Sequence, residues 1–150
     1  MWNLLLAVTN FTAYYPIITA LLAGDVITAG IIAFAAVMSV VSHLFESHKH
    51  GMNGFGCSPR VSYLLNRLDV LAVILVIGRM LWICFTSRSV LVIVGSPSLM
   101  LLLSLALICN LLSEADRGKR YYVPLHCIWH LSIFLLLDSS LKSHYRYHHS

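Results

Sequence analysis

The sequence predicts an all-α membrane protein: a multi-pass helical bundle of about five transmembrane helices, forming a single domain over residues 1–150. Of the 150 residues, 59% are hydrophobic and only 11% are charged, whereas a soluble domain typically has ~25% charged residues. The apolar residues gather in stretches of about the ~20 residues that a membrane-spanning helix needs, with short polar segments between them. The predicted spans are approximately residues 2–22, 26–45, 63–85, 90–112 and 122–141.

The first two spans are expected to form a hairpin. Residues 2–22 contain Pro16 near their centre, where a proline is expected to kink the helix. The stretch is not preceded by the basic region of a signal peptide and lacks a clear cleavage site, so we expect it to be retained as a span. Ala23-Gly24-Asp25 predicts a tight turn because Gly and Asp favour turn conformations. The second span, residues 26–45, follows directly.

The third and last spans are bounded by polar segments. A glycine-rich polar segment, residues 46–60, precedes the third span, and the amphipathic residues 61–68 can lengthen that helix at its start. Residues 113–120 form a loop, and residues 122–141 form the last span before a short tail rich in His, Tyr and Arg.

The fourth stretch, residues 90–112, is ambiguous because Gly95-Ser96-Pro97 interrupts it. It is either one span kinked at Pro97 or two short half-helices. The position of the polar residues in the neighbouring spans decides between these alternatives.

Five polar residues within the apolar stretches are candidates for a functional site. His126 and His130 open the last span, and positions i and i+4 of a helix lie on one face, where two imidazoles can bind one metal ion. His43 lies near the end of the second span, one turn after Ser39, and Asp69 lies near the start of the third. Polar side chains at membrane depth are costly, so they usually mark a site.

The five residues share one membrane side only if residues 90–112 cross the membrane once, which predicts five spans in total. The segments of that side carry Lys49, Arg60, Arg67, Arg117, Lys119 and Arg120. The other side carries Arg88, Lys142 and Arg146, with Arg79 expected to extend toward it. The excess of basic residues predicts that the site and the N-terminus face the cytosol. The expected location is an integral membrane protein of either an endomembrane (ER or Golgi) or the plasma membrane.

The three histidines match the ligand number of catalytic zinc, which takes three protein ligands and keeps a fourth position for water. Zinc lowers the pKa of that water to ~7. Asp69 is then the candidate general base, and Ser39 is the candidate donor to the oxyanion or an orienting partner. A site in lipid would act on a lipid substrate, so the sequence predicts an intramembrane zinc hydrolase of a lipid amide or ester.

Other interpretations stay open. The zinc could be structural, in a non-enzymatic protein with a role in membrane organisation or fusion, and Cys109 would then be a candidate fourth ligand because structural zinc sites are closed. Haem is a further alternative, although an i, i+4 pair on one helix suits its axial ligands poorly. Glu46, three residues after His43, is expected to be a charge at the membrane surface, with a contact to that histidine as the alternative.

Two further classes of function or structure are not indicated. No basic run with interleaved aromatic residues is present, so no nucleic-acid partner is expected, and protein partners are not indicated. The cysteines are scattered over several spans, so we expect buried free thiols rather than a disulfide framework. They are Cys57, Cys84, Cys109 and Cys127.

The set Ser39-x-x-x-His43, Asp69 and His126-x-x-x-His130 resembles the CREST superfamily of membrane hydrolases. That superfamily includes the alkaline ceramidases, the adiponectin-receptor (PAQR) family, the GPI-lipid remodelling factors and the myomaker family. The last-span segment LHCIWH is especially similar to the ceramidase and GPI-remodelling versions, in which Trp also precedes the second histidine. The resemblance covers the second, third and fifth spans. It implies zinc on the three histidines, with the aspartate and serine assisting hydrolysis.

The chain also departs from that family. Members usually have seven spans, whereas this chain predicts five, and the separation of His43 and Asp69 is longer than in the ceramidases. We therefore expect a compact member of the superfamily.

Overall fold

The computed structural model describes residues 2–46, 54–87, 95–116 and 120–148, and within these ranges the secondary structure is helical, with no strand. The elements in chain order are α1 (Trp2–Thr9), the 3-10 helix η1 (Asn10–Ala13), α2 (Tyr14–Leu22), α3 (Val26–Leu44), α4 (Pro59–Ser87), α6 (Pro97–Ala115) and α7 (Tyr122–His148).

Five helical segments of the described chain are long and apolar enough to cross a membrane, which confirms the predicted all-α multi-pass bundle. They are Trp2–Leu22, Val26–Leu44, Pro59–Thr86, Pro97–Ala115 and Tyr122–Arg146. By length and composition the chain is therefore a membrane protein.

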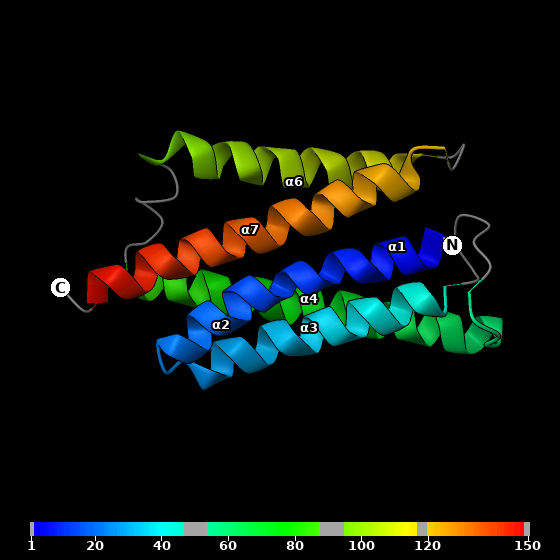
Figure 1. The fold of residues 1–150 in the computed structure, drawn as a ribbon, viewed down its shortest axis with the longest axis horizontal. Coiled ribbons are helices and arrows are strands. Elements are labelled where there is room, and N and C mark those ends of the chain that lie inside the picture. The colour runs from blue at the N-terminus through cyan, green and yellow to red at the C-terminus, as the bar shows by residue number, and fades with distance from the viewer. Residues whose placement is uncertain (1, 47–53, 88–94, 117–119, 149–150) are drawn as a thin grey trace.

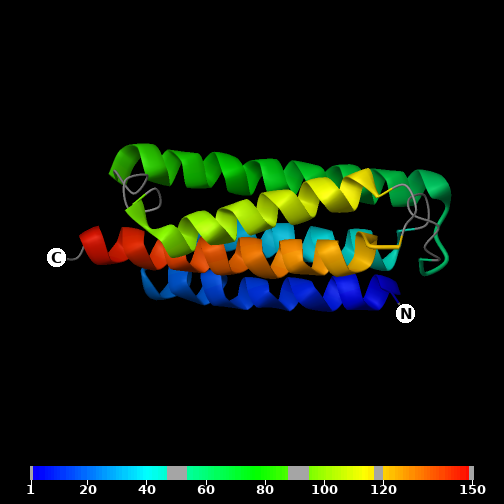
Figure 2. The same cartoon turned by 90° about the horizontal axis from the view of Figure 1, so that it is seen from above.

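The helices run side by side as an elongated bundle (Figure 1). α3 packs along α4, α6 packs along α7, and the α1–α2 segment packs against both α3 and α7. Figure 2 shows α4 at one edge of the bundle and α1–α2 at the other. The start of α1, the end of α3, the start of α4, the end of α6 and the start of α7 meet at one end of the bundle, hereafter the metal end. The five predicted site residues all lie toward this end. This agrees with the prediction that the chain runs the length of the bundle once between the third and the last span, as α6.

The first span is not a uniform α-helix. The 3-10 helix η1 separates α1 from α2, and it contains Thr12, whose carbonyl lies four residues before Pro16. A proline ring clashes with the carbonyl at that position and its nitrogen cannot donate to it. The irregularity expected at Pro16 is therefore a tightened turn just before the proline, and this turn contains Asn10.

The predicted turn between the first two spans is present. Gly24 has φ of 77°, a left-handed conformation that glycine adopts without steric cost. Asp25 caps α3, its Oδ1 accepting a hydrogen bond from the backbone N–H of Thr28 at 3.0 Å. At the other end of α3, the Asn3 side chain donates from Nδ2 to the carbonyl of His43 at 2.7 Å and so anchors α1 to the metal end.

Several helix boundaries differ from those expected. The prediction that the loop begins at residue 113 was wrong, because α6 continues to Ala115. α4 begins at Pro59, so the amphipathic residues 61–68 are helical, and α7 continues to His148. Pro97 is at the start of α6 and not at a kink within a helix. A proline fits the first turn of a helix, where its missing N–H would have no partner, and Ser96 before it is extended. Residues 90–94 of the predicted fourth span lie outside the described residues.

Small side chains let the central helices approach closely. Ala13, Ala20 and Ala29 are buried in a cluster with Phe134 and Leu137 of α7. In a membrane, where lipid chains are as apolar as leucine, close backbone approach and van der Waals contact drive such association. All four cysteines are free thiols, as expected, but only Cys109 is buried, whereas Cys57, Cys84 and Cys127 are half-buried.

A polar network, hereafter the Asp25 network, joins α3, α4 and α7 at the end opposite the metal end. Arg79 of α4 donates to Asp25 Oδ2 at 2.8 Å and to Thr28 Oγ1 at 2.7 Å. The Tyr145 hydroxyl of α7 donates to the same carboxylate at 3.0 Å. Burial alone would raise the pKa of Asp25, but the hydrogen bonds from Thr28, Arg79 and Tyr145 outweigh it and lower the pKa from 3.8 to about 2.

Candidate metal centre

The three predicted histidines come together at the metal end. His43 of α3 and His126 and His130 of α7 are all buried, and each offers a ring nitrogen within 4.8 Å of the other two. Their ring centroids lie 4.7 to 5.2 Å apart. Among the described residues, these three form a group that can hold a metal ion.

The Nδ1 atom of each histidine faces a partner, and the partners fix the tautomer. Nδ1 of His43 lies 3.2 Å from Oε2 of Glu46, on the residue that follows the C-cap of α3. A carboxylate that accepts at this distance takes the hydrogen bond from Nδ1, which then carries the proton. Glu46 is 2% exposed, and the Tyr122 side chain hydrogen-bonds to it as well. The expectation of a membrane-surface charge at Glu46 was wrong: the end of α3 turns this side chain inward.

The second histidine is fixed through the first span. Nδ1 of His130 lies 2.8 Å from the hydroxyl of Thr9, and that hydroxyl donates its own proton to the Leu6 carbonyl at 2.7 Å. A hydroxyl has one proton, so Thr9 can only accept from the histidine. With the Thr9 proton given to Leu6, Nδ1 of His130 carries the proton, and the amide nitrogen of Asn10 lies farther from it, at 3.4 Å.

The third histidine follows the same logic on α6. Nδ1 of His126 lies 3.4 Å from the hydroxyl of Ser113, which donates to the Asn110 carbonyl at 2.8 Å. The Ser113 hydroxyl is therefore also an acceptor toward the ring.

All three rings consequently keep Nε2 as the nitrogen with a lone pair. Nε2 of His43 is buried and has no hydrogen-bond partner among the described residues. Metal-binding histidines usually donate their other ring N–H to an acceptor, which fixes the tautomer and raises ligand basicity. Three segments of the fold supply those acceptors here, namely α1, α6 and the residue after the C-cap of α3, so the arrangement suits a cation bound by three Nε2 atoms.

A cavity of about 660 Å³ adjoins the histidines. It lies between α4 on one side and α6 and α7 on the other, and all three histidines line it. Its polar lining is at the metal end and includes Asn10, Ser39, Asn66, Asp69, Asn110, Glu114 and Tyr122. Farther along the bundle its lining is mostly apolar, with Val73, Ile77, Met80, Leu107, Phe134 and Leu137.

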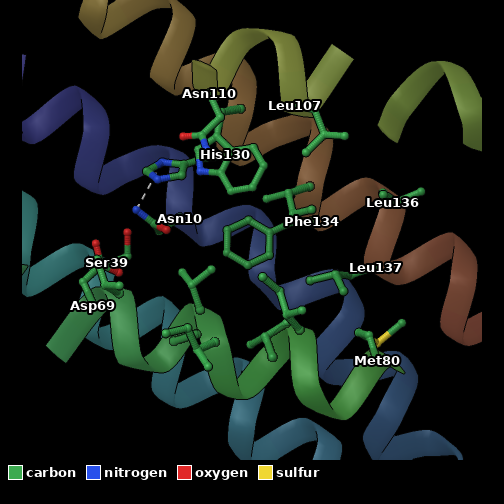
Figure 3. A pocket seen from close by; sticks show the side chains of 18 of the residues that line it. Asn10, Ser39, Asp69, Met80, Leu107, Asn110, His130, Phe134, Leu136 and Leu137 are labelled. Carbon is green, nitrogen blue, oxygen red and sulfur yellow. Dashed lines mark hydrogen bonds between the residues drawn. The ribbon is translucent and has the colours of Figure 1, made fainter. Parts of the chain in front are cut away.

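Both predicted assisting residues line this cavity. Ser39 reaches it from α3 and Asp69 from α4. Figure 3 shows these two side chains, with Asn10 and His130, on one side of the cavity, and Phe134, Leu137 and Met80 on the other. The five residues singled out from the sequence are thus brought to one cavity.

The cavity is open at the side of the bundle. Several residues that line it are also about half exposed, among them Ile74 and Ile77 of α4 and Leu107 of α6. These side chains lie within the spanning segments, so the opening faces the lipid chains of a membrane.

Cys109 does not join the histidines. It is buried on α6, but it belongs neither to the metal-compatible group nor to the lining of the cavity. The thiol considered as a fourth ligand is therefore placed elsewhere.

Several residues of the site were not identified from the sequence. They are Thr9, Asn10, Asn66, Ser113 and Glu114. Thr9 and Asn10 are adjacent polar residues inside an apolar span, which is itself a signal of a site. Ser113 and Glu114 fall at the end of a helix, where polar residues are ordinary and carry no such signal.

Comparison with known proteins places the chain in a family. It is 39% identical over 149 residues to an uncharacterized protein of Acanthamoeba polyphaga mimivirus, a match that covers 95% of this chain and 98% of the viral protein. The chain belongs to the same family as that protein. No protein-family model and no solved structure matches it.

Proposed function

We propose that this chain is an intramembrane zinc-dependent hydrolase that cleaves a lipid amide or ester bond, as a compact member of the CREST superfamily. The observation that carries the proposal is a buried cluster of three histidines, each with Nδ1 held by an acceptor, beside a cavity that is polar at the histidines and apolar beyond them. Such a cavity matches a lipid, whose polar bond would lie at the metal end and whose chain would lie along the apolar part.

The donor set supports zinc. Three neutral imidazoles are a common ligand set of catalytic zinc, and imidazole suits this metal. Nitrogens that share a tetrahedral zinc at ~2.0–2.1 Å lie about 3.4 Å apart, so a modest inward movement of the rings completes the site. When bound, zinc supplies a water of lowered pKa and polarises the substrate carbonyl.

Asp69 and Ser39 have distinct roles in the proposed reaction. The Asp69 carboxylate accepts a proton from the attacking water and transfers it to the leaving nitrogen or oxygen as the carbonyl bond to that atom breaks. The products are a fatty acid and an amine or alcohol, so one water is consumed for each bond cleaved. The Ser39 hydroxyl donates a hydrogen bond to the carbonyl oxygen as negative charge develops on it.

Two observations favour this function over its alternatives. A structural zinc is normally closed by a fourth protein ligand, whereas Cys109 is outside the metal-compatible group and a cavity adjoins the histidines. The histidine rings meet at 4.7 to 5.2 Å, a spacing that suits one ion and leaves no plane between them for a porphyrin.

The test is metal analysis and hydrolysis by the purified full-length protein in lipid nanodiscs. We expect one zinc per chain, release of fatty acid from long-chain amides or esters, and loss of release with retained zinc in Asp69→Asn. A zinc-loaded protein that cleaves none of these lipids, and whose Asp69→Asn variant leaves cellular lipid composition unchanged, would overturn the proposal in favour of a structural zinc. A Soret band without zinc would overturn it in favour of haem.

The proposed orientation has the metal end in the cytosol. Arg60, Arg67 and Arg120 are the described basic residues of that end among those expected there. Labelling of a cysteine introduced at Arg120 by a membrane-impermeant reagent should require permeabilised cells. Labelling of intact cells, with the protein at the plasma membrane, would reverse the orientation.

A further inference from the structure

The cavity beside the histidines is elongated along the bundle. Its lining runs on α4 from Asn66 to Cys84 and on α7 from Tyr122 to Ser140, so it advances by 18 residues on each helix. At about 1.5 Å per residue this is a length of about 27 Å. One leaflet supplies about half of a hydrocarbon core of ~30 Å, so the cavity continues past the middle of the membrane. Figure 3 shows it from Asp69 at the polar side to Met80.

The far end of the cavity is closed by helix packing. Ile83 of α4 and Leu141 of α7 are buried in one core cluster, and Tyr145 packs against it. The Tyr145 hydroxyl and the Arg79 side chain both donate to the carboxylate of Asp25, which ties α7 to α4. The two helices that form the walls of the cavity therefore meet at its far end, and this closure gives the cavity a definite length.

The distance from the histidines to the closed end fits an acyl chain of moderate length. Asp69 lies 15 residues before Cys84 on α4, and His126 and His130 lie 14 and 10 residues before Ser140 on α7. Counted from Asp69 and from the midpoint of the two histidines, these separations are about 18–22 Å. An extended hydrocarbon chain advances about 1.25 Å per carbon, because its bonds of about 1.5 Å form a zigzag. About 16 carbons therefore span the distance.

The volume of the cavity agrees with a single acyl chain. A cavity of about 660 Å³ holds roughly 20 groups the size of a water molecule or a methylene, at ~30 Å³ each. One chain of about 16 carbons with its carbonyl group fills this space, whereas two such chains exceed it. A second chain of the same lipid would leave through the lateral opening beside Ile74 and Leu107, where the lining is half exposed.

We propose that the cavity selects the acyl chain of its substrate by length, with Cys84 and Ser140 at the far end as the specificity-determining residues. This inference rests on the proposed function and narrows its substrate class to lipids with an acyl chain of about 14–18 carbons. Ser140 is 4% exposed and Cys84 is half-buried, and both side chains are small. A longer chain has to bend against the packed end or leave the cavity sideways, and overfilling a packed site is unfavourable.

Photoreactive fatty acids locate the acyl chain without requiring turnover. A 16-carbon acid with a diazirine near its terminal carbon is added to the full-length protein in lipid nanodiscs, and the crosslinked residues that excess palmitic acid protects are identified by mass spectrometry. We expect this probe to label the far end, around Met80, Cys84 and Ser140. The same acid with its diazirine beside the carboxyl group should instead label the metal end, around Asn66 and Tyr122.

Competition by saturated fatty acids of 12 to 24 carbons, compared at equal mole fraction of the lipid, measures the length limit. We expect acids of 14–18 carbons to compete best, and the acid of 22 carbons to compete at least about fivefold less well than that of 16 carbons. Ser140→Leu and Cys84→Leu should each lower the limit by about two carbons, because the larger side chain reaches about 2.5 Å farther. Ser139→Leu is the matched control, since Ser139 does not line the cavity, and it should keep the wild-type limit.

Several results would overturn the inference. Terminal labels on the outer faces of the helices would place the acyl chain outside the cavity. Equal competition by the acids of 16 and 22 carbons would mean that longer chains leave sideways without cost. A limit that stays unchanged in both leucine variants would equally overturn the assignment. If Ser140→Leu does not fold, Cys84→Leu at its half-buried position still decides. Absence of hydrolysis by the zinc-loaded protein, with the labels and the length limit as expected, would count against the proposed function alone.

Discussion

The two ends of the bundle carry polar clusters of opposite character. In the Asp25 network, one carboxylate receives hydrogen bonds from Thr28, Arg79 and Tyr145, and charges are paired. At the metal end, by contrast, Nε2 of His43 and Oδ1 of Asn10 are buried without a partner among the described residues. A network in which every polar group has a hydrogen-bond partner stabilises the packing of helices, whereas buried polar atoms without partners beside a cavity are typical of a ligand site.

The largest expected difference between the ends is in metal binding. His126→Ala removes one of three ligands, so we expect zinc affinity to fall by at least about 100-fold, more than for a change in a supporting residue. Elemental analysis and competition with a chelator measure it. His144→Ala is the control, since this histidine is also on α7 but contacts Tyr145 near the other end. Equal zinc loss in both variants would contradict the assignment.

The next effect concerns stability at the other end. Asp25→Ala leaves the Arg79 guanidinium without its carboxylate, and we expect a loss of roughly 2–3 kcal/mol, below the 3–5 kcal/mol of a fully buried pair because both side chains are partly exposed. Unfolding in denaturing detergent measures the change. Zinc content should stay normal, and the added change Arg79→Met should recover part of the stability. A loss of zinc would show that the two ends are coupled.

A smaller effect on the metal is expected from its supporting carboxylate. Glu46→Gln keeps the shape of the side chain but removes the charge beside His43, and loss of such a partner typically lowers metal affinity 10–100-fold. Chelator competition measures the affinity. Asp116→Asn is the matched control, because Asp116 also lies at the metal end but accepts from the backbone of Tyr121. If Glu46→Gln binds zinc as tightly as the wild type, the carboxylate does not support the site.

The smallest expected effect is a dependence of stability on acid pH. The pKa of Asp25 is about 2 in the folded protein against an ordinary 3.8, so the folded state favours the ionised form. The stability from this group is therefore complete above about pH 4 and is lost as the pH falls toward about 2. The difference in unfolding midpoint between wild type and Asp25→Asn should shrink over that range. A difference that stays constant would mean that ionisation of Asp25 does not stabilise the fold.

The features that follow periodic or compositional rules could be predicted from the sequence. Apolar length gave the five helices, and the one-turn spacings Ser39 to His43 and His126 to His130 correctly placed these residues on one cavity with Asp69. Polar residues are rare within membrane spans, so these few residues were enough to predict the site.

The remainder depends on contacts between helices, which a single sequence does not encode locally. The acceptor for His130 comes from Thr9, far away in the chain, and the acceptor for His126 comes from Ser113 on another helix. Glu46 was assigned to the surface because it ends a span, yet the chain turns it inward after Phe45. Pro97 was predicted to kink a longer span, but it lies at the start of α6. Where that helix starts depends on chain geometry that composition does not reveal.

The gap between α4 and the α6–α7 pair has a consequence for how this protein would meet its ligands. Its rim is formed by half-exposed apolar side chains such as Ile74 and Leu107. On the proposed function, a lipid would therefore enter sideways from within a leaflet, without passing through water. The concentration that governs occupancy is then a mole fraction in a two-dimensional fluid. Adding inert lipid or detergent at constant total ligand would empty the cavity, while changing the volume of buffer would not.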